Sequence, residues 1–125
     1  MTKYRTKNLF LSFKFAFRGL FLTIKTHRNF QIGVLISIFV MTAAVLLKFN
    51  PIEIALTSLS VGFVLFAELV NSTIESIIDT YFGNNYSEIA KISKDVAAGT
   101  VLIALLNAII IGALLFFPKL ANLLY

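Results

Sequence analysis

The sequence predicts an all-α membrane protein: one amphipathic helix at the membrane surface, followed by three helices that cross the bilayer. Of its 125 residues, 58% are hydrophobic and 14% are charged, whereas soluble domains average roughly 45–50% apolar and about 25% charged residues. Three predominantly apolar stretches are each long enough to cross the hydrocarbon core of a bilayer. The length fits a single domain, residues 1–125. The absence of cysteine excludes a disulfide framework and a thiolate metal site.

The predicted surface helix covers residues 8–26. Its apolar side chains recur at helical spacing at Leu9, Phe13, Ala16, Phe17, Leu20 and Ile24. Its cations fall three, four or seven residues apart at Lys7, Lys14, Arg18 and Lys25. A helix with such a cationic face suits the membrane interface. The alternative, a surface helix of a soluble protein, needs a soluble core that this composition does not supply.

The three predicted spans occupy residues 30–48, 52–80 and 95–117. Pro51 is well placed at the first turn of the second span, because its missing N–H has no partner there anyway. Residues 83–87 read as a loop, being rich in Gly, Asn and Ser. Residues 88–94 are predicted to begin a helix in the interface, and Pro118 and Lys119 follow the third span.

The distribution of cations predicts the orientation. Seven of the eleven cations lie in the first 28 residues, with no acid among them: Lys3, Arg5, Lys7, Lys14, Arg18, Lys25 and Arg28. Three spans place Lys91 and Lys94 on the same side as this segment, and Lys48 and Lys119 on the other. The positive-inside rule therefore predicts a cytoplasmic N-terminus. We do not expect nucleic-acid binding, because the cations are interleaved with Leu and Phe and lead into a span.

Polar side chains form a row along the second predicted span. On an ideal helix Glu68, Asn71, Ser72, Glu75 and Asp79 fall within one stripe about 100° wide. Ionisable residues in a span are costly and usually face a bundle interior or a water-filled cavity. Structural hydrogen bonds between helices are the alternative role. Two carboxylates one heptad apart, with a third beyond them, favour a site for a cation or a proton.

Two further polar clusters lie at the same predicted membrane level. One is Lys91, Ser93, Lys94 and Asp95 at the entrance to the third span; the other is His27, Arg28, Asn29 and Gln31 before the first. Lys94 beside Asp95 is either an interfacial anchor pair or a holder of a phosphate near a metal. A single histidine at such a position is commonly incidental. No Walker A motif and no kinase glycine-rich loop occur, which excludes a soluble kinase fold.

Four segments of the sequence resemble one family. They are Glu-Leu-Val-Asn-Ser-Thr-Ile-Glu-Ser-Ile-Ile-Asp at 68–79, Ala-Lys-Ile-Ser-Lys-Asp-Val-Ala-Ala-Gly at 90–99, Arg-Asn-Phe at 28–30 and Phe-Pro-Lys-Leu at 117–120. Together they resemble the small prokaryotic diacylglycerol kinase family, which includes the undecaprenol kinases of Gram-positive bacteria. The resemblance covers roughly residues 10–120.

The resemblance implies a multi-pass lipid kinase of the bacterial cell (inner) membrane. It implies a homotrimer with shared active sites that transfers the γ-phosphate of ATP to a lipid hydroxyl. The tail at 117–120 and the Lys-Asp-Val-Ala-Ala-Gly segment favour undecaprenol as acceptor, with diacylglycerol next. The expected metal is Mg²⁺, which prefers oxygen ligands.

Roles for individual residues follow from the same resemblance. Glu68 matches the general base and, with Asn71, contacts the lipid substrate. Glu75 matches a ligand of the metal that bridges the phosphates of ATP. Nucleotide contacts are implied for Phe15, Glu75, Asn85, Tyr86, Ser87, Lys94 and Asp95.

The sequence departs from the family pattern at two of these positions. His27 stands where the family usually has a second metal-binding Glu, and Ser87 stands where a His is frequent. His27 and Glu75 are therefore the predicted metal ligands. Imidazole favours Zn²⁺ or a similar ion over Mg²⁺. A weakened or inactive family member with a structural role is therefore the second hypothesis. A small ion or proton carrier is the third, although residues 30–48 and 96–117 of the other two spans carry no acid to complete a path.

Overall fold

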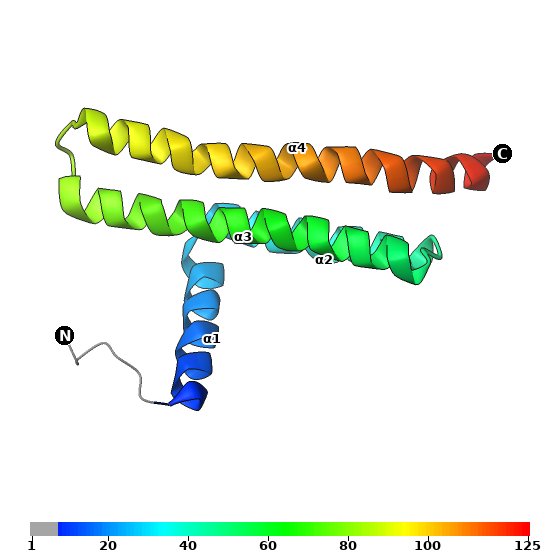
Figure 1. Cartoon of the computed structure of the whole chain (residues 1–125), viewed down its shortest axis with the longest axis horizontal. Coiled ribbons are helices and arrows are strands. Elements are labelled where there is room, and N and C mark those ends of the chain that lie inside the picture. Colours follow the sequence, from blue (N-terminus) through cyan, green and yellow to red (C-terminus); the bar gives the residue numbers. More distant parts are fainter. Residues whose placement is uncertain (1–7) are drawn as a thin grey trace.

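The computed structural model describes residues 8–125, and within them it consists of four α-helices. These are α1 (Leu9–Thr26), α2 (Arg28–Leu46), α3 (Pro51–Phe82) and α4 (Glu88–Leu124). In Figure 1, α2, α3 and α4 run side by side along the longest direction, and α1 stands crosswise to them. The expected all-α architecture, with one N-terminal helix and three long apolar ones, is confirmed. The cations at Lys3, Arg5 and Lys7 lie outside the described residues.

Side-chain caps fix where three of these helices begin. The Asn8 side chain accepts hydrogen bonds from the N–H groups of Phe10 and Leu11 at 2.7 and 3.3 Å. Asn50 and Glu53 form a reciprocal capping box around Pro51. The Ser87 hydroxyl accepts from the N–H of Ala90 at 3.4 Å. Each cap satisfies backbone donors that the first turn of a helix leaves unpaired.

Helix α3 packs against both α2 and α4. The residues that α4 buries are small and one heptad apart: Ala90, Ala97 and Ala104. Helix α3 buries Ala67 and four short polar side chains, Thr57, Ser60, Asn71 and Ser72. Small residues let two helix backbones approach closely, which is the usual way that helices associate in a membrane. The α3–α4 contact is therefore a seam of short side chains.

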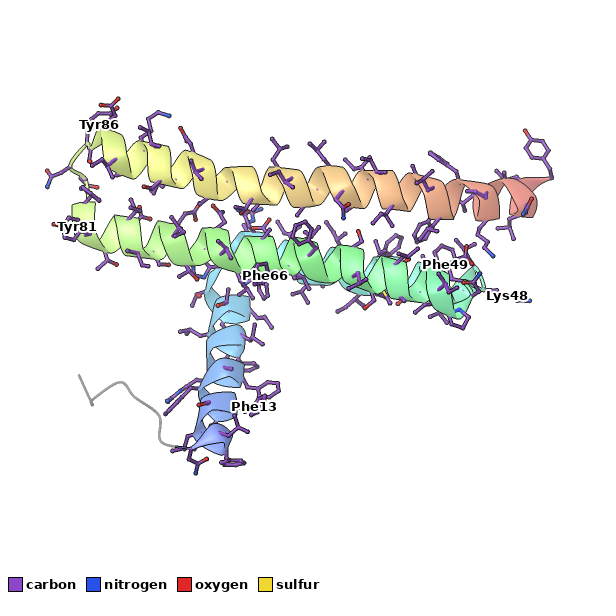
Figure 2. All side chains as sticks on the ribbon, viewed as in Figure 1. Phe13, Lys48, Phe49, Phe66, Tyr81 and Tyr86 are labelled. Atoms are coloured by element: carbon purple, nitrogen blue, oxygen red, sulfur yellow. The ribbon has the colours of Figure 1, made fainter. Side chains whose placement is uncertain are left out.

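Most large apolar side chains point outward, and Phe30 and Phe49 are the buried exceptions among the described residues. Phe39 is 74% exposed and Leu59 is 71% exposed, and Figure 2 shows such side chains along the whole bundle. Helices α2, α3 and α4 are each long and apolar enough to cross a membrane. A lipid environment removes the penalty that water would impose on these surfaces. The outward-facing apolar surface thus supports a chain that spans the bilayer.

Helix α4 continues through Pro118, which the sequence placed after the third span. Proline removes one backbone hydrogen bond and normally kinks or ends a helix. Contacts on both sides of Pro118 stabilise the continuous helix here. The Phe116 ring lies 4.7 Å from that of Phe49, and the Lys119 ammonium lies 3.4 Å from a Glu53 carboxylate oxygen. Tertiary packing at the far end of the bundle therefore outweighs the local preference of proline.

Candidate active site

The polar stripe of α3 contains buried acceptors that need a donor. Asn71 is 6% exposed, and its Nδ2 donates a hydrogen bond to Oε1 of Glu75 at 3.4 Å. Oε2 of Glu68 and Oδ1 of Asn71 are buried, and neither finds a hydrogen-bond partner within the described residues. Buried polar atoms are nearly always paired in native proteins. These two oxygens are therefore the places where a hydrogen-bond donor on a ligand would gain most.

An apolar groove of about 870 Å³ begins at Glu68 and is lined by α2, α3 and α4. Asn29 also lines it, and Phe116, Phe117 and Leu120 line the part near the opposite end of the bundle. Glu68 is the one ionisable side chain among the described residues that line it. The groove therefore fits a molecule with a long hydrocarbon portion and a polar group at one end.

A second, smaller cavity of about 250 Å³ lies where α3 and α4 are joined by their loop. It brings together five of the predicted nucleotide-binding residues, Asn85, Tyr86, Ser87, Lys94 and Asp95. Tyr86 and Tyr81 mark this end of the bundle in Figure 2, opposite Lys48 and Phe49. Asp79 and Lys91 line the same cavity. The loop and the start of α4 thus form one polar site.

Two ion pairs line this polar cavity, one between α3 and α4 and one within α4. The Lys94 ammonium pairs with the carboxylate of Asp79, which comes from α3. Lys91 pairs with Asp95 one turn further along α4, at 2.7 Å between Nζ and Oδ2. Both pairs are largely exposed to solvent. The sequence suggested Lys94 beside Asp95 as a phosphate holder or an anchor pair; in the structure Lys94 pairs with Asp79 instead, and Asp95 pairs with Lys91.

His27 lies at the break between α1 and α2 and faces α3. Its Nδ1 is 3.0 Å from the Thr26 hydroxyl, and its Nε2 is 3.4 Å from the hydroxyl of Ser76. Both ring nitrogens are thus occupied by hydroxyl groups. Ser76 follows Glu75 in the sequence, so the contact between His27 and Ser76 places His27 at the same level of the bundle as Glu75. The sequence predicted this shared level.

Phe15 is separate from the other predicted nucleotide contacts. It lies on α1, is 47% exposed and lines neither of the two cavities. Figure 2 shows α1, marked by Phe13, standing away from the end of the bundle that carries Tyr81 and Tyr86. Within one chain, Phe15 therefore does not reach the polar cavity.

Comparison with known proteins identifies the family. A model of the prokaryotic diacylglycerol kinase family matches residues 14–116. The chain belongs to this family. A diacylglycerol kinase of Synechocystis sp. is 41% identical over 117 residues, which cover 94% of this chain and 67% of the relative. An undecaprenol kinase of Bacillus subtilis is 36% identical over 111 residues, which cover 89% of each chain.

Membership of the prokaryotic diacylglycerol kinase family makes the protein a lipid kinase and implies ATP as the phosphoryl donor. Kinases neutralise the charge of the transferred phosphoryl group with a divalent cation. No group of three or more His, Asp and Glu side chains that could hold a metal occurs in the described part of the chain. Mg²⁺ nevertheless binds many kinases through one or two carboxylates and the phosphates of the substrate. Glu75, oriented by Asn71, fits that requirement.

Reasoning from sequence missed Ser76, which the structure places beside His27. Ser76, the partner of His27, lies about 100° from Glu75 around the helix and outside the polar stripe. Asn29, which the sequence placed in the cluster with His27 and in the Arg-Asn-Phe segment, lines the apolar groove together with Glu68. Lys91 belongs to the predicted cluster with Asp95, and their pairing could also have been predicted, because residues four apart on a helix lie side by side.

Proposed function

We propose that this protein transfers the γ-phosphate of ATP to the hydroxyl of a membrane lipid alcohol, with a divalent metal ion. The observation that carries the proposal is that α3 lines both cavities, the apolar groove at Glu68 and the polar cavity at Asp79. These two residues are about 16 Å apart along the helix axis. Glu75 lies between them, where a lipid headgroup and a nucleotide would meet.

The level of the membrane surface supports this division. In Figure 1, α1 joins the bundle part-way along it, and the linked ends of α3 and α4 project beyond that junction. If α1 lies in the interface, as its cationic and apolar faces favour, the apolar groove is on the membrane side and the polar cavity on the aqueous side. Under the positive-inside rule that aqueous side is the cytoplasm of a bacterial cell, where ATP is available.

In the proposed reaction Glu68 is the general base. The lipid hydroxyl donates a hydrogen bond to the buried Oε2 of Glu68, which has no partner within the described residues. As the hydroxyl oxygen attacks the γ-phosphorus, its proton passes to this carboxylate, and ADP leaves. Asn71 lies one turn away, lines the reaction centre and holds the Glu75 carboxylate in place.

On the nucleotide side, the proposal assigns charge neutralisation to Glu75 and Lys94. Glu75 would hold Mg²⁺, which offsets charge on the phosphates, and Lys94 would contact the phosphates directly. Asp95 and the loop residues Asn85, Tyr86 and Ser87 would bind the remainder of the nucleotide. These assignments follow the family resemblance, and the gathering of the loop and α4 residues around one cavity supports them.

We also propose that the protein works as a homotrimer with shared active sites. Large apolar side chains are exposed along the three long helices, so neighbouring copies have surfaces on which to pack. Phe15 does not reach the polar cavity of its own chain, and a shared site would let it contact nucleotide bound by a neighbour. A trimer would thus account for the predicted contact between Phe15 and the nucleotide, which a single chain cannot make.

The acceptor that we favour is undecaprenol, with diacylglycerol next. The Phe-Pro-Lys-Leu tail supports undecaprenol, and Phe117 and Leu120 of that tail line the apolar groove. The two relatives named above carry one activity each, which keeps diacylglycerol as the comparison in any assay.

A catalytically weakened kinase is the second candidate, and one observation favours it. Both ring nitrogens of His27 lie beside hydroxyl groups, of Thr26 and Ser76. With His27 so engaged, Glu75 would hold the metal without a second protein ligand. The affinity for Mg²⁺ would then be low, or another ion such as Zn²⁺ would replace it.

An acceptor panel tests the proposal. The purified protein in lipid nanodiscs is given γ-labelled ATP with undecaprenol or with diacylglycerol, first in Mg²⁺ and then in Zn²⁺. Labelled lipid phosphate that depends on the acceptor supports the proposed reaction, and the better acceptor identifies the substrate. ATP consumption without labelled lipid in all four conditions would contradict it. Absence of any turnover would favour the second candidate.

A further inference from the structure

Four charged side chains at the polar cavity neutralise one another. Asp79 and Lys94 form one ion pair across the cavity, from α3 to α4. Lys91 and Asp95 form the other along α4. The charges of these four residues sum to zero. A nucleotide that enters the cavity therefore meets two carboxylates as well as two ammonium groups.

The two ion pairs differ in what a phosphate group would have to displace. Lys91 and Asp95 stand on the same helix, so the pair can remain closed while a ligand binds beside it. Lys94 and Asp79 stand on facing helices and both line the cavity, so their pair joins α4 to α3. Polyphosphate that reaches Lys94 therefore competes with Asp79 for the Lys94 ammonium group.

Exchange of partners at Lys94 is energetically accessible. The Lys94 side chain is 41% exposed and the Asp79 side chain is 63% exposed. Exposed ion pairs contribute little to stability because water screens them. Charge-assisted hydrogen bonds from a cation to a phosphate are shorter and stronger than neutral ones. The Asp79 carboxylate already forms such a bond with Lys94, but a nucleotide polyphosphate carries several negative charges where Asp79 carries one, so it attracts the Lys94 ammonium more strongly.

We propose that Asp79 restrains Lys94 in the nucleotide-free protein and releases it to the phosphates of the incoming nucleotide. The inference rests on the proposed binding of nucleotide in the polar cavity. Asp79 is then a positioning residue that acts through Lys94. Its presence lowers nucleotide affinity, because each binding event must break the Asp79–Lys94 pair and bring phosphate close to a carboxylate.

Removing the charge of Asp79 tests the proposal. Binding of a non-hydrolysable ATP analogue to the full-length protein in nanodiscs is measured by calorimetry, without turnover. Asp79→Asn should tighten binding about two- to fivefold, the range expected for an exposed ion pair. Asp79→Glu keeps the charge and should bind as the unaltered protein does. Equal or weaker binding by Asp79→Asn would overturn the inference.

Two further variants separate partner exchange from a general charge effect. Glu88→Gln changes the net charge by the same amount, and Glu88 is exposed near the cavity without lining it. The Glu88→Gln variant should bind the ATP analogue as the unaltered protein does. In a Lys94→Met background, Asp79→Asn should no longer tighten binding. If the gain persists without Lys94, Asp79 does not act through Lys94 and the proposal is wrong.

The unaltered protein separates this inference from the proposed function. If it binds no nucleotide, the proposed kinase site and the inference both fail. If it binds nucleotide and phosphorylates lipid while Asp79→Asn shows no gain, the inference alone fails.

Discussion

The side-chain amide of Asn71 donates a hydrogen bond to the carboxylate of Glu75, 3.4 Å away and one turn further along α3. This contact supports a role for Asn71 in orienting Glu75, the residue proposed above to hold the metal. Residues that orient a metal ligand typically change metal affinity or activity by about 10- to 100-fold when removed. We therefore expect Asn71→Ala to lower kcat by about 10- to 100-fold and to weaken Mg²⁺-dependent nucleotide binding.

Steady-state kinetics and calorimetry with varied Mg²⁺ check this prediction for Asn71. Ser72→Ala is the matched control, since Ser72 is the adjacent residue and equally buried. It should change kcat less than threefold. A similar loss in both variants would show that packing, and not the orientation of Glu75, is responsible.

Glu68→Gln should remove the proposed general base for the lipid hydroxyl while leaving nucleotide binding intact. General base catalysis contributes about 10²- to 10⁴-fold to a rate, so we expect a fall in kcat of that size with little change in the KM for ATP. Glu75→Gln provides the contrast, because it should also remove Mg²⁺-dependent nucleotide binding. Retention of more than a tenth of the activity by Glu68→Gln would remove Glu68 as the base.

His27→Glu should raise Mg²⁺-dependent activity. The substitution places a second carboxylate at the level of Glu75, and Mg²⁺ prefers oxygen ligands to imidazole. The measurement is lipid-dependent turnover as a function of Mg²⁺ and Zn²⁺ concentration. Ser76→Ala is the control, because it removes the contact between Ser76 and His27 without adding a carboxylate. Unchanged or lower activity at every Mg²⁺ concentration would mean that residue 27 is not a metal position.

Lys119→Met should lower stability without lowering kcat. The ammonium of Lys119 lies 3.4 Å from a carboxylate oxygen of Glu53, and the two side chains are only 32% and 18% exposed. Removing one partner of this pair leaves the other charge unpaired, which should lower the midpoint of unfolding. Thermal unfolding in detergent measures the loss. Lys48→Met lies at the same end of the bundle and should leave the midpoint unchanged; a large fall there would point to a general effect of charge.

The helical architecture could be predicted because lipid exposure leaves a strong signal in the sequence. Long uncharged stretches can satisfy their backbone only as helices in a bilayer, and the segment from Gly83 to Ser87 interrupts them with residues typical of loops. The stripe from Glu68 to Asp79 followed from helical geometry alone. Neither prediction depends on how the helices pack against one another.

Other features depend on packing and could not be predicted. The contact of His27 with Ser76 joins residues 49 positions apart, and no local pattern relates them. The stripe located Asp79 on α3, but the pair with Lys94 also requires the angle and register at which α4 faces α3. The helix continues through Pro118 because Phe116 and Lys119 have partners on another part of the chain. Each of these outcomes belongs to tertiary structure.

The three buried alanines of α4, spaced seven residues apart, have a mechanical consequence. Ala90, Ala97 and Ala104 make the α3–α4 seam smooth, so few side chains interlock to oppose sliding of one helix along the other. Among the described residues, ion pairs join these two helices at opposite ends of the bundle, Asp79 with Lys94 and Glu53 with Lys119. Resistance to a shift in register is therefore concentrated at the two ends. Opening the pair at Lys94 would leave the far end as the remaining charged anchor, about which the helix pair can pivot.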